Sequence, residues 1–269
     1  MSSRVKAVIP AAGYGTRLQP VTYAVAKELL PVARKPMIHL AVEEAVQAGV
    51  EHISVIIRKG KECIRDYIDS LSGEQLKRSG ARITFIYQNE PLGLGNAVYQ
   101  ARRFIADSPF MVIIPDQFVF SDNPPARRIL NASGYDPGAV WCGFTLIPAE
   151  QENYFPNCRP YALDPHGDKF WRVRGFAPRP EKIGEKISIG FGRTYYPPGT
   201  LTYFSEKYMN PDTGEVDMLR TFQALLEDCP CYAIHLEGTA ADFGTWPGYE
   251  YFTGKTMVSL GSNINFQVR

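Results

Sequence analysis

The chain has 269 residues, of which 45% are hydrophobic and 21% charged, and its formal net charge is +1. This balance excludes a disordered chain, and the length suits one large α/β domain or a core with a built-in smaller lobe. With so little net charge there is no general attraction to nucleic acid, so we expect no nucleic-acid partner. The N-terminus lacks the apolar stretch of a secretion signal, and no apolar run could span a bilayer, so we expect no membrane partner.

The cysteines and histidines form no recognisable structural or metal site. The five cysteines include no Cys-x-x-Cys pair, and the four histidines lack the spacing of zinc ligands. Free thiols of this kind are typical of a reducing compartment, which predicts a cytoplasmic protein. The sequence leaves both a monomer and a homo-oligomer open.

The first half of the chain alternates short apolar runs with amphipathic stretches. The runs have the length of buried strands, and the amphipathic stretches repeat their apolar residues at helical spacing. Strands alternating with helices imply right-handed crossovers and a mostly parallel sheet with helices on both faces. In chain order we expect a strand over 5–10, a helix over 38–48, a strand over 52–57, a helix over 63–71, a strand over 83–87, a helix over 96–105 and a strand over 110–114.

The second half of the chain is less regular, because proline, glycine and aromatic residues are frequent there. We expect it to add strands and loops to the sheet and to close over a cleft, with few residues left after Tyr249 for a long C-terminal helix. No repeat or linker interrupts the chain, so residues 1–269 should form a single domain with halves of 1–120 and 121–269. The expected elements are strands over 139–146, 170–173 and 187–191 and a helix over 218–226.

Residues 10–20, Pro-Ala-Ala-Gly-Tyr-Gly-Thr-Arg-Leu-Gln-Pro, follow the first strand and contain a glycine-rich turn. Glycines after a strand let backbone N–H groups approach phosphate oxygens, so this turn is a candidate phosphate site. It is no dinucleotide fingerprint, because Leu18 stands where the third glycine belongs, and it lacks the Gly-Lys-Ser/Thr ending of a Walker A loop. By itself the pattern is equally that of a tight turn.

Basic residues beyond the turn favour the phosphate-binding interpretation. Arg17 lies in the turn, Lys27 begins the string Lys-Glu-Leu-Leu-Pro, and Lys35-Pro36 follows. A triphosphate carries about four negative charges and a departing pyrophosphate needs compensation, which Arg17 and Lys27 would supply.

The pattern Gly13-x-Gly15-Thr16-Arg17, with Lys27 and Lys35-Pro36, resembles the signature of the sugar-1-phosphate nucleotidylyltransferases. It is most similar to the bacterial UTP–glucose-1-phosphate uridylyltransferases (UDP-glucose pyrophosphorylases), with the glucose-1-phosphate thymidylyltransferases close behind. The resemblance implies a Rossmann-like, glycosyltransferase-A-like sheet with a smaller β-rich sugar-binding lobe. It also implies nucleotidyl transfer from a pyrimidine nucleoside triphosphate, with UTP favoured, to a sugar-1-phosphate, with glucose-1-phosphate favoured. The residues implied for this nucleotide are Ala11, Ala12, Gly13, Gly15, Thr16, Gln88 and Gly93, with Arg17 and Lys27 as catalytic cations.

A second motif, residues 88–97 with the sequence Gln-Asn-Glu-Pro-Leu-Gly-Leu-Gly-Asn-Ala, joins a strand to a helix. A glutamine amide offers a donor and an acceptor to a pyrimidine edge, and a glycine lets the backbone contact a ring. The local alternative is a polar turn capped by Asn96. The spacing from Gln88 to Gly93 resembles that of pyrimidine-using family members, which implies that these two residues hold the base.

Two aspartates are candidates for a metal site. Asp116 ends an apolar run, where α/β proteins place ligand chemistry, and Asp242 precedes an aromatic segment. Both match by motif the pair that jointly holds one Mg²⁺ in the family, and oxygen ligands suit that ion. The reaction implied is an in-line attack of the sugar-phosphate oxygen on the α-phosphorus, helped by Mg²⁺, Arg17 and Lys27, with no enzyme nucleophile.

The sugar side departs from the family pattern. Where the family has Glu-Lys-Pro, residues 178–180 are Pro-Arg-Pro. Arg179 replaces the lysine as a phosphate cation, but Pro178 supplies no acceptor for sugar hydroxyls. A shifted alignment would use Glu181 instead. Ala162 stands where the family has glycine, and we expect Ala162 and Arg179 to bind the sugar phosphate.

Three functions stay open. The similarity covers nearly the whole chain, including Gly192-Arg193 and the acidic turn 214–217. It favours uridylyl transfer to glucose-1-phosphate or a related sugar phosphate. A thymidylyltransferase that uses dTTP is the second hypothesis, since Gln88 suits either base. The third is a catalytically weak sugar-nucleotide binder or regulator, which Pro178 suggests.

Overall fold

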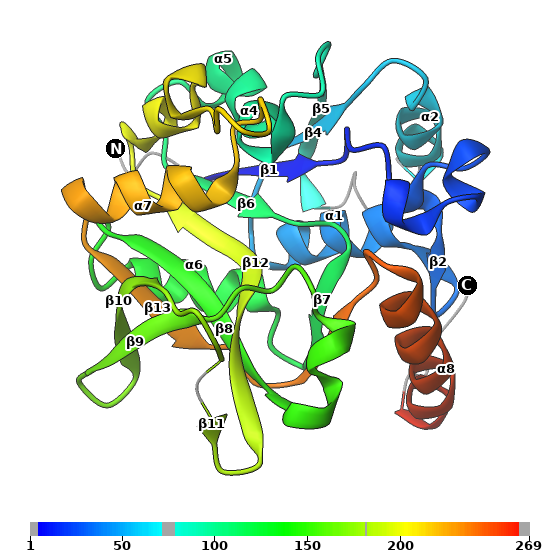
Figure 1. Cartoon of the computed structure of the whole chain (residues 1–269). Helices are drawn as coiled ribbons and strands as arrows, with labels where there is room; N and C mark the ends of the chain where they lie inside the picture. Colours follow the sequence, from blue (N-terminus) through cyan, green and yellow to red (C-terminus); the bar gives the residue numbers. More distant parts are fainter. Residues whose placement is uncertain (1–4, 72–78, 181, 264–269) are drawn as a thin grey trace.

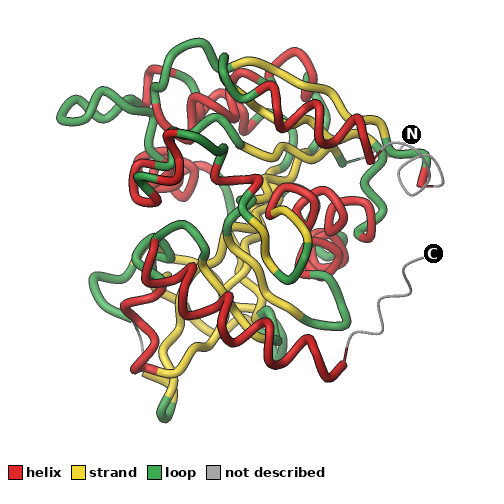
Figure 2. The backbone as a smooth tube through the Cα atoms, turned by 90° about the vertical axis from the view of Figure 1, so that its right-hand side faces the viewer, coloured by secondary structure: helices red, strands yellow, loops and turns green. Residues whose placement is uncertain are grey.

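A mixed sheet of ten strands runs through the computed structural model, which describes residues 5–71, 79–180 and 182–263 (Figure 1). The strand order is β5-β4-β1-β6-β12-β8-β13-β10-β9, and β11 pairs with β12. Figure 2 shows these strands, in yellow, as a central layer with red helices on both sides. The sheet strands are β1 (Lys6–Pro10), β4 (His52–Ile57), β5 (Arg82–Tyr87), β6 (Phe110–Ile113), β8 (Val140–Pro148), β9 (Tyr161–His166), β10 (Phe170–Phe176), β11 (Lys182–Ile183), β12 (Lys186–Tyr196) and β13 (Cys231–His235).

The first half of the sheet is parallel, as its apolar strands predict. β1 pairs in parallel with β4 and β6, and β4 pairs in parallel with β5. Successive side chains point to opposite faces, so Ala7 and Ile9 join one hydrophobic core and Val8 joins the other. Strands buried on both faces in this way need helices on both sides.

The helices divide between these two cores. α1, α2 and α6 bury their apolar residues in the first core, and α4, α5 and α7 in the second. Within the described ranges, no helix is apolar and long enough to cross a bilayer. The helices are α1 (Met37–Gln47), α2 (Glu62–Leu71), α4 (Gly93–Gln100), α5 (Arg102–Ile105), α6 (Pro125–Ser133), α7 (Met218–Asp228) and α8 (Trp246–Asn263), and the 3₁₀ turns are η1 (Thr16–Leu18), η2 (Val21–Tyr23), η3 (Lys27–Leu29), η4 (Ala149–Tyr154), η5 (Thr200–Phe204) and η6 (Glu206–Tyr208).

The second half of the sheet is mainly antiparallel. β12 is antiparallel to both β6 and β8, so it joins the two halves, while β8 and β13 form a parallel pair. The expected α/β fold is confirmed, with the added strands in the second half. The expectation about the C-terminus is wrong, because α8 has 18 residues. It begins at Trp246, with Pro247 in the first turn, where a helix tolerates proline.

Two short ribbons lie outside the main sheet. β2 (Pro31–Val32) pairs with β3 (Lys35–Pro36), and β7 (Gln117–Phe120) pairs with β14 (Thr239–Asp242), both antiparallel. In the second ribbon, which the sequence did not predict, Gln117 lies opposite Asp242. The N–H of Phe243 donates to the carbonyl oxygen of Asp116 at 2.8 Å. Asp116 and Asp242 are therefore brought to the same end of this ribbon.

A buried ion pair holds the junction of the two halves. The guanidinium of Arg193, on β12, is fully buried and donates to both carboxylate oxygens of Glu44, on α1, at 2.6–3.0 Å. Its Nη1 also donates to the carbonyl oxygens of Ile114 and Gly192, at 2.8 and 3.0 Å. Glu44 in turn accepts from the N–H of Ala126 at the start of α6, at 3.0 Å. One charged cluster thus ties two helices to the joining strand.

Replacing Arg193 with leucine should lower the free energy of unfolding by about 3–5 kcal/mol, because Glu44 would stay buried without its countercharge. Urea denaturation measures the change. The matched control is Arg174→Leu, whose pair with Asp164 is exposed on both sides and should contribute under about 1 kcal/mol. Equal losses in the two variants would contradict a bracing role for Arg193.

Candidate active site

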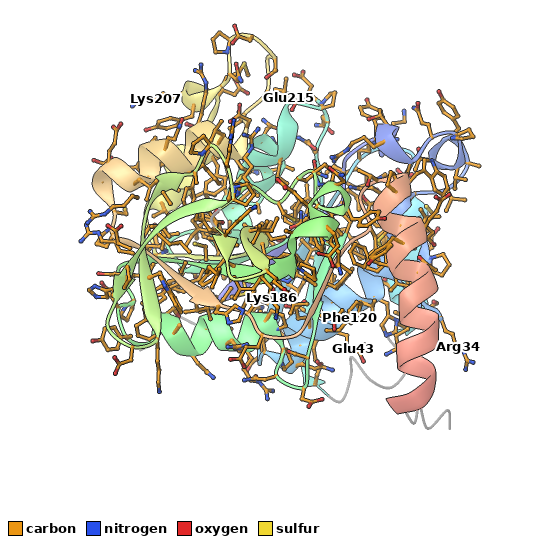
Figure 3. All side chains as sticks on the ribbon, turned by 60° about the horizontal axis from the view of Figure 1, so that its bottom comes forward. Arg34, Glu43, Phe120, Lys186, Lys207 and Glu215 are labelled. Atoms are coloured by element: carbon orange, nitrogen blue, oxygen red, sulfur yellow. The ribbon has the colours of Figure 1, made fainter. Side chains whose placement is uncertain are left out.

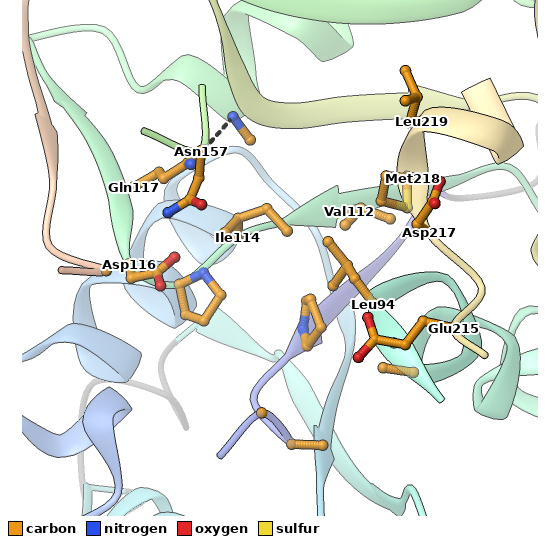
Figure 4. Close-up of a pocket in the computed structure, with 18 of the residues that line it drawn as sticks. Leu94, Val112, Ile114, Asp116, Gln117, Asn157, Glu215, Asp217, Met218 and Leu219 are labelled. Atoms are coloured by element: carbon orange, nitrogen blue, oxygen red, sulfur yellow. Dashed lines mark hydrogen bonds between the residues drawn. The ribbon is translucent and has the colours of Figure 1, made fainter. Parts of the chain in front are cut away.

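A cleft of about 850 Å³ opens at the carboxyl ends of β1 and β6, the edge at which parallel sheets place their ligand sites. Figure 4 shows Asp116 and Asn157 on one side of this cleft and Glu215 and Asp217 on the other. The glycine turn after β1 and the strand β12 also contribute to its lining. The predicted nucleotide half and the predicted sugar half therefore face one another across a single space.

The glycine turn forms part of the cleft wall, with Ala12, Gly13 and Thr16 in the lining. Gly15 has a φ of 70°, and a Cβ there would lie 2.9 Å from the Thr22 side chain, so glycine is required at this position. Ala11 is buried behind the wall, where its N–H donates to the carbonyl oxygen of Ile56 at 2.7 Å. Ala11 thus anchors the turn, and the other predicted residues face the cleft.

Both predicted cations line the cleft. The guanidinium of Arg17 donates to the side-chain oxygen of Asn157, a residue from the second half of the chain. The ammonium of Lys27 lies 2.6 Å from an oxygen of Asp116. The turn and the η3 segment therefore bring two positive charges to the same part of the cleft, as the sequence predicts.

Lys27 and Asp116 stabilise each other's charged form. Burial lowers the pKa of Lys27, but the negative charges of Asp116 and Glu28 outweigh burial, and the net effect is a pKa above the ordinary value. Burial raises the pKa of Asp116, but the charge and hydrogen bond of Lys27, with the charge of Arg17, outweigh it and lower that pKa. Both groups are therefore ionised at neutral pH.

Asp242 is fully buried beside this pair. Burial, followed by the charge of Asp116, raises the pKa of Asp242 to about 6. Its carboxylate accepts from the N–H of Gly244 at 2.8 Å and from the amide of Gln117 at 3.4 Å. A Cβ on Gly244 would lie 3.0 Å from an oxygen of each aspartate, so the two carboxylates face the same small space.

Gln88 and Gly93 lie together where β5 ends and α4 begins, and both line the cleft. The Gln88 amide donates to the carbonyl oxygen of Gly93 at 3.1 Å. Gly93 has a φ of 87°, and a Cβ there would lie 2.8 Å from the Cβ of Glu215. The alternative role of Asn96 as a helix cap is wrong, because the N-cap position of α4 is Leu92 and Asn96 lies inside that helix.

A buried ion pair behind the turn was missed by sequence analysis. The Lys61 ammonium donates to Glu28 at 2.7 Å and to the carbonyl oxygen of Ala11 at 3.0 Å. Glu28 follows Lys27 in the chain, so this pair ties the glycine turn to the segment that carries Lys27. Lys61 follows β4 and belongs to no motif, so no local signal could have identified it.

The residues predicted to bind the sugar phosphate lie outside the cleft lining. Ala162 is on β9 opposite Gly175, and Arg179 is exposed in the segment after β10. Glu181, from the shifted alignment, lies outside the described residues. The second half of the chain lines the cleft with other side chains, among them Asn157, Arg159, Tyr161, Phe176 and Thr194.

The loop after η4 supplies three consecutive residues of interest that carry no sequence motif. Asn157 contacts Arg17, and Arg159 lines the cleft. Between them, the buried thiol of Cys158 lies 3.7 Å from an oxygen of Asp242. Burial, the charges of Asp242 and Asp116 and the contact with Asp242 raise the pKa of the Cys158 thiol well above its usual value, so it is neutral.

Comparison with known proteins identifies the class. Residues 6–256 match a family model described as nucleotidyl transferase. The UTP–glucose-1-phosphate uridylyltransferase of Bacillus subtilis is 32% identical over 261 residues, which cover 91% of this chain and 88% of that protein. The chain therefore belongs to the nucleotidyl transferase family, as its sequence motifs predict.

Solved structures share the fold. The apo form of a UDP-glucose pyrophosphorylase matches with a TM-score of 0.79 at 20% identity, covering 95% of this chain and 98% of that one. A UDP-glucose pyrophosphorylase complexed with UDP-glucose matches with a TM-score of 0.78 at 21% identity, covering 95% of this chain and 99% of that one. The mixed sheet with helices on both faces is thus an architecture that this chain shares with UDP-glucose pyrophosphorylases.

Replacing Asp242 with asparagine should stabilise the metal-free protein at pH 7.5 and have little effect near pH 4. A pKa raised to about 6 means that the stability contributed by the neutral carboxyl is present at acid pH and is lost as the pH rises through that value. Asparagine keeps the neutral state, so the gain at pH 7.5 should be about 1–3 kcal/mol.

Urea denaturation in EDTA at the two pH values measures this difference. Asp164→Asn is the control, because that carboxylate is exposed and should show no comparable pH-dependent gain. The same change in stability at both pH values would show that the pKa of the Asp242 carboxyl is not raised.

Proposed function

We propose that this protein transfers the uridylyl group of UTP to glucose-1-phosphate, giving UDP-glucose and pyrophosphate. The observation that carries this proposal is the meeting of Arg17, Lys27 and Asp116 at the glycine turn, in one cleft. Two anionic substrates can approach each other only where positive charge offsets their repulsion. The 32% identity to a UTP–glucose-1-phosphate uridylyltransferase, over 91% of this chain, supports the choice of substrates.

In this proposal the nucleotide lies along the side of the cleft that residues 1–120 line. Backbone N–H groups of residues 12–16 face the triphosphate, as a glycine turn after a strand allows. Ala11 supports the turn from behind. Gln88 and Gly93 hold the uracil, and their place in the cleft lining supports that role.

Asp116 and Asp242 are the residues we propose to hold Mg²⁺. Their carboxylates face the same space beside Gly244, and oxygen ligands suit this ion. Among the described residues there is no cluster of three or more His, Cys, Asp or Glu side chains that could hold a metal. Two carboxylates completed by substrate phosphates and water are a usual Mg²⁺ site. When bound, the ion would neutralise phosphate charge at the reacting centre.

The chain's own residues orient and neutralise the reacting groups. The sugar-phosphate oxygen is already an anion, so it attacks the α-phosphorus in line as pyrophosphate leaves, and no side chain forms a covalent intermediate. Lys27 and Arg17 offset the charge that moves onto the departing pyrophosphate. The contact of Arg17 with Asn157 links the glycine turn to the loop after η4.

The sugar phosphate lies against the side of the cleft that residues 121–269 line. Arg159 lines that part, while Arg179 and Ala162 lie outside the lining. The sugar-phosphate role of Arg179 and Ala162 therefore stays a prediction, and Arg159 is a second candidate cation. Pro178 supplies no acceptor for the sugar hydroxyls, and Glu181, the alternative from the shifted alignment, lies outside the described residues.

We place the reaction in the cytoplasm. The cysteines are all free thiols, which persist in a reducing compartment. The organisation as one domain, with a nucleotide half of 1–120 and a sugar half of 121–269, belongs to the same proposal.

The purified protein should release pyrophosphate fastest from UTP and glucose-1-phosphate in the presence of Mg²⁺, and the reaction should stop in EDTA. Without the family glutamate, other sugar-1-phosphates should react within about tenfold of glucose-1-phosphate. A panel of nucleoside triphosphates against sugar-1-phosphates, read by pyrophosphate release, measures both. Faster release from dTTP would contradict the choice of UTP, and no release from any pair would contradict nucleotidyl transfer.

Arg17→Ala and Lys27→Ala should each lower kcat by about 10²–10³, because their charges compensate phosphate charge in the transition state. Circular dichroism checks that each variant is folded. Lys207→Ala is the control, since Lys207 lies outside the cleft lining and should leave kcat unchanged (Figure 3). Either cleft variant with the turnover of the unmodified protein would rule out its catalytic role.

A further inference from the structure

Three side-chain amides form a connected network behind the base-binding end of the cleft. Nε2 of Gln88 donates to the carbonyl oxygen of Gly93 at 3.1 Å and to Oδ1 of Asn96 at 3.0 Å. Nε2 of Gln100, one turn further along α4, donates to the same Oδ1 at 3.2 Å. Gln88 and Asn96 are only 6% and 3% exposed, so water does not compete freely for these bonds.

Two acceptors together hold the orientation of the Gln88 amide. The carbonyl oxygen of Gly93 belongs to the main chain and can only accept, so it pairs with the Gln88 NH₂. Asn96 presents its oxygen to the same NH₂, and Gln100 holds that oxygen in place by donating its own NH₂ to it. A flipped Gln88 would place its oxygen against two other acceptors.

The helix that carries this network is held in place by the loop before α7. The N–H of Gly95 donates to the carbonyl oxygen of Val216, and the N–H of Val216 donates to the carbonyl oxygen of Leu92, both at 2.8 Å. A Cβ on Gly95 would lie 2.6 Å from Val216, so glycine permits this close contact. Figure 3 shows Glu215, from the same loop, beside α4. Asn96 is therefore presented to Gln88 by a fixed element.

The remaining Gln88 group, its side-chain oxygen, is left for a ligand. Gln88 lines the cleft, and in the described part of the chain no residue donates a hydrogen bond to this oxygen. An acceptor at this position pairs with a base that offers a donor. Uracil and thymine carry N3–H at the middle of their pairing edge, whereas cytosine has an acceptor at N3.

We propose that Asn96, supported by Gln100, is a specificity-determining positioning residue that makes the site select uracil or thymine over cytosine. The inference rests on the proposed function, in which Gln88 and Gly93 hold the base. Asn96 acts through Gln88, by keeping its oxygen toward the cleft. Without Asn96, the amide loses one of its two acceptors and can turn its NH₂ toward cytosine.

The test compares UTP with CTP in Asn96→Leu and Asn96→Asp. The leucine variant should lower the ratio of kcat/KM for UTP to that for CTP by about tenfold. A site selects between two bases by a hydrogen bond that only one of them can form, and in this variant Gln88 is no longer held in the orientation that accepts from uracil. The aspartate variant keeps an acceptor for both glutamine amides and should retain the ratio within about threefold. The ratio of UTP to dTTP should stay constant in both variants, because their pairing edges are the same.

A merely structural role for Asn96 would lower the two kcat/KM values by the same factor, and an unchanged UTP-to-CTP ratio in Asn96→Leu would overturn the proposal. Gln100→Leu provides a milder variant if Asn96→Leu does not fold, and its ratio should fall in the same direction. An unchanged ratio in folded Gln100→Leu, with Asn96→Leu unfolded, would also overturn it.

Calorimetric binding of UTP and CTP, without sugar phosphate, separates this inference from the proposed function. A protein that binds UTP more tightly than CTP, and loses that preference in the leucine variants, supports the role of Asn96 even if no sugar-1-phosphate reacts. Equal binding of UTP and CTP by the unmodified protein would overturn the inference, whether or not the transfer reaction is observed.

Discussion

The site depends on the burial of two aspartates beside a lysine. Like charges that are buried together repel strongly, and burying a charge without a partner carries a large desolvation penalty. Lys27 lies 2.6 Å from Asp116. Burial, followed by the charge of Asp116, raises the pKa of Asp242 to about 6, although the Gly244 N–H and the charges of Lys27 and Arg17 partly offset that rise. In the proposed reaction, Mg²⁺ held by these two carboxylates would offset this repulsion. The raised pKa of Asp242 and its proposed role as a metal ligand therefore have the same physical origin.

Backbone pairing creates this arrangement of charges. β7 begins directly after Asp116 and pairs with β14, which ends at Asp242, so the register of one short ribbon sets the spacing of the two carboxylates. The rest of the sheet holds that ribbon in place. β12 joins the parallel and antiparallel halves, and the buried pair of Arg193 with Glu44 braces the joint. An ion pair outside the cleft thereby stabilises the geometry of residues within it.

Groups outside the cleft orient groups within it at two further places. Lys61 connects the carbonyl oxygen of Ala11 with Glu28, which holds the glycine turn against the segment of Lys27. Asn96 connects Gln88 with α4. In both cases a buried hydrogen-bonding group limits the rotation of a neighbour, and preorganisation of this kind reduces the entropy lost when substrate binds. The phosphate end and the base end of the cleft are thus supported in the same way.

The sequence by itself determined the parallel half of the fold and the nucleotide chemistry, because both are encoded locally. A buried strand followed by a glycine turn is decided within a few residues, and Gly13, Arg17 and Lys27 belong to one short segment. The tertiary structure alone decided which side chains of the second half share the cleft. There Arg159 lines it and Arg179 does not. That outcome depends on pairings between residues far apart in the chain, such as β12 with β6 and β14 with β7, and no local pattern specifies such a register.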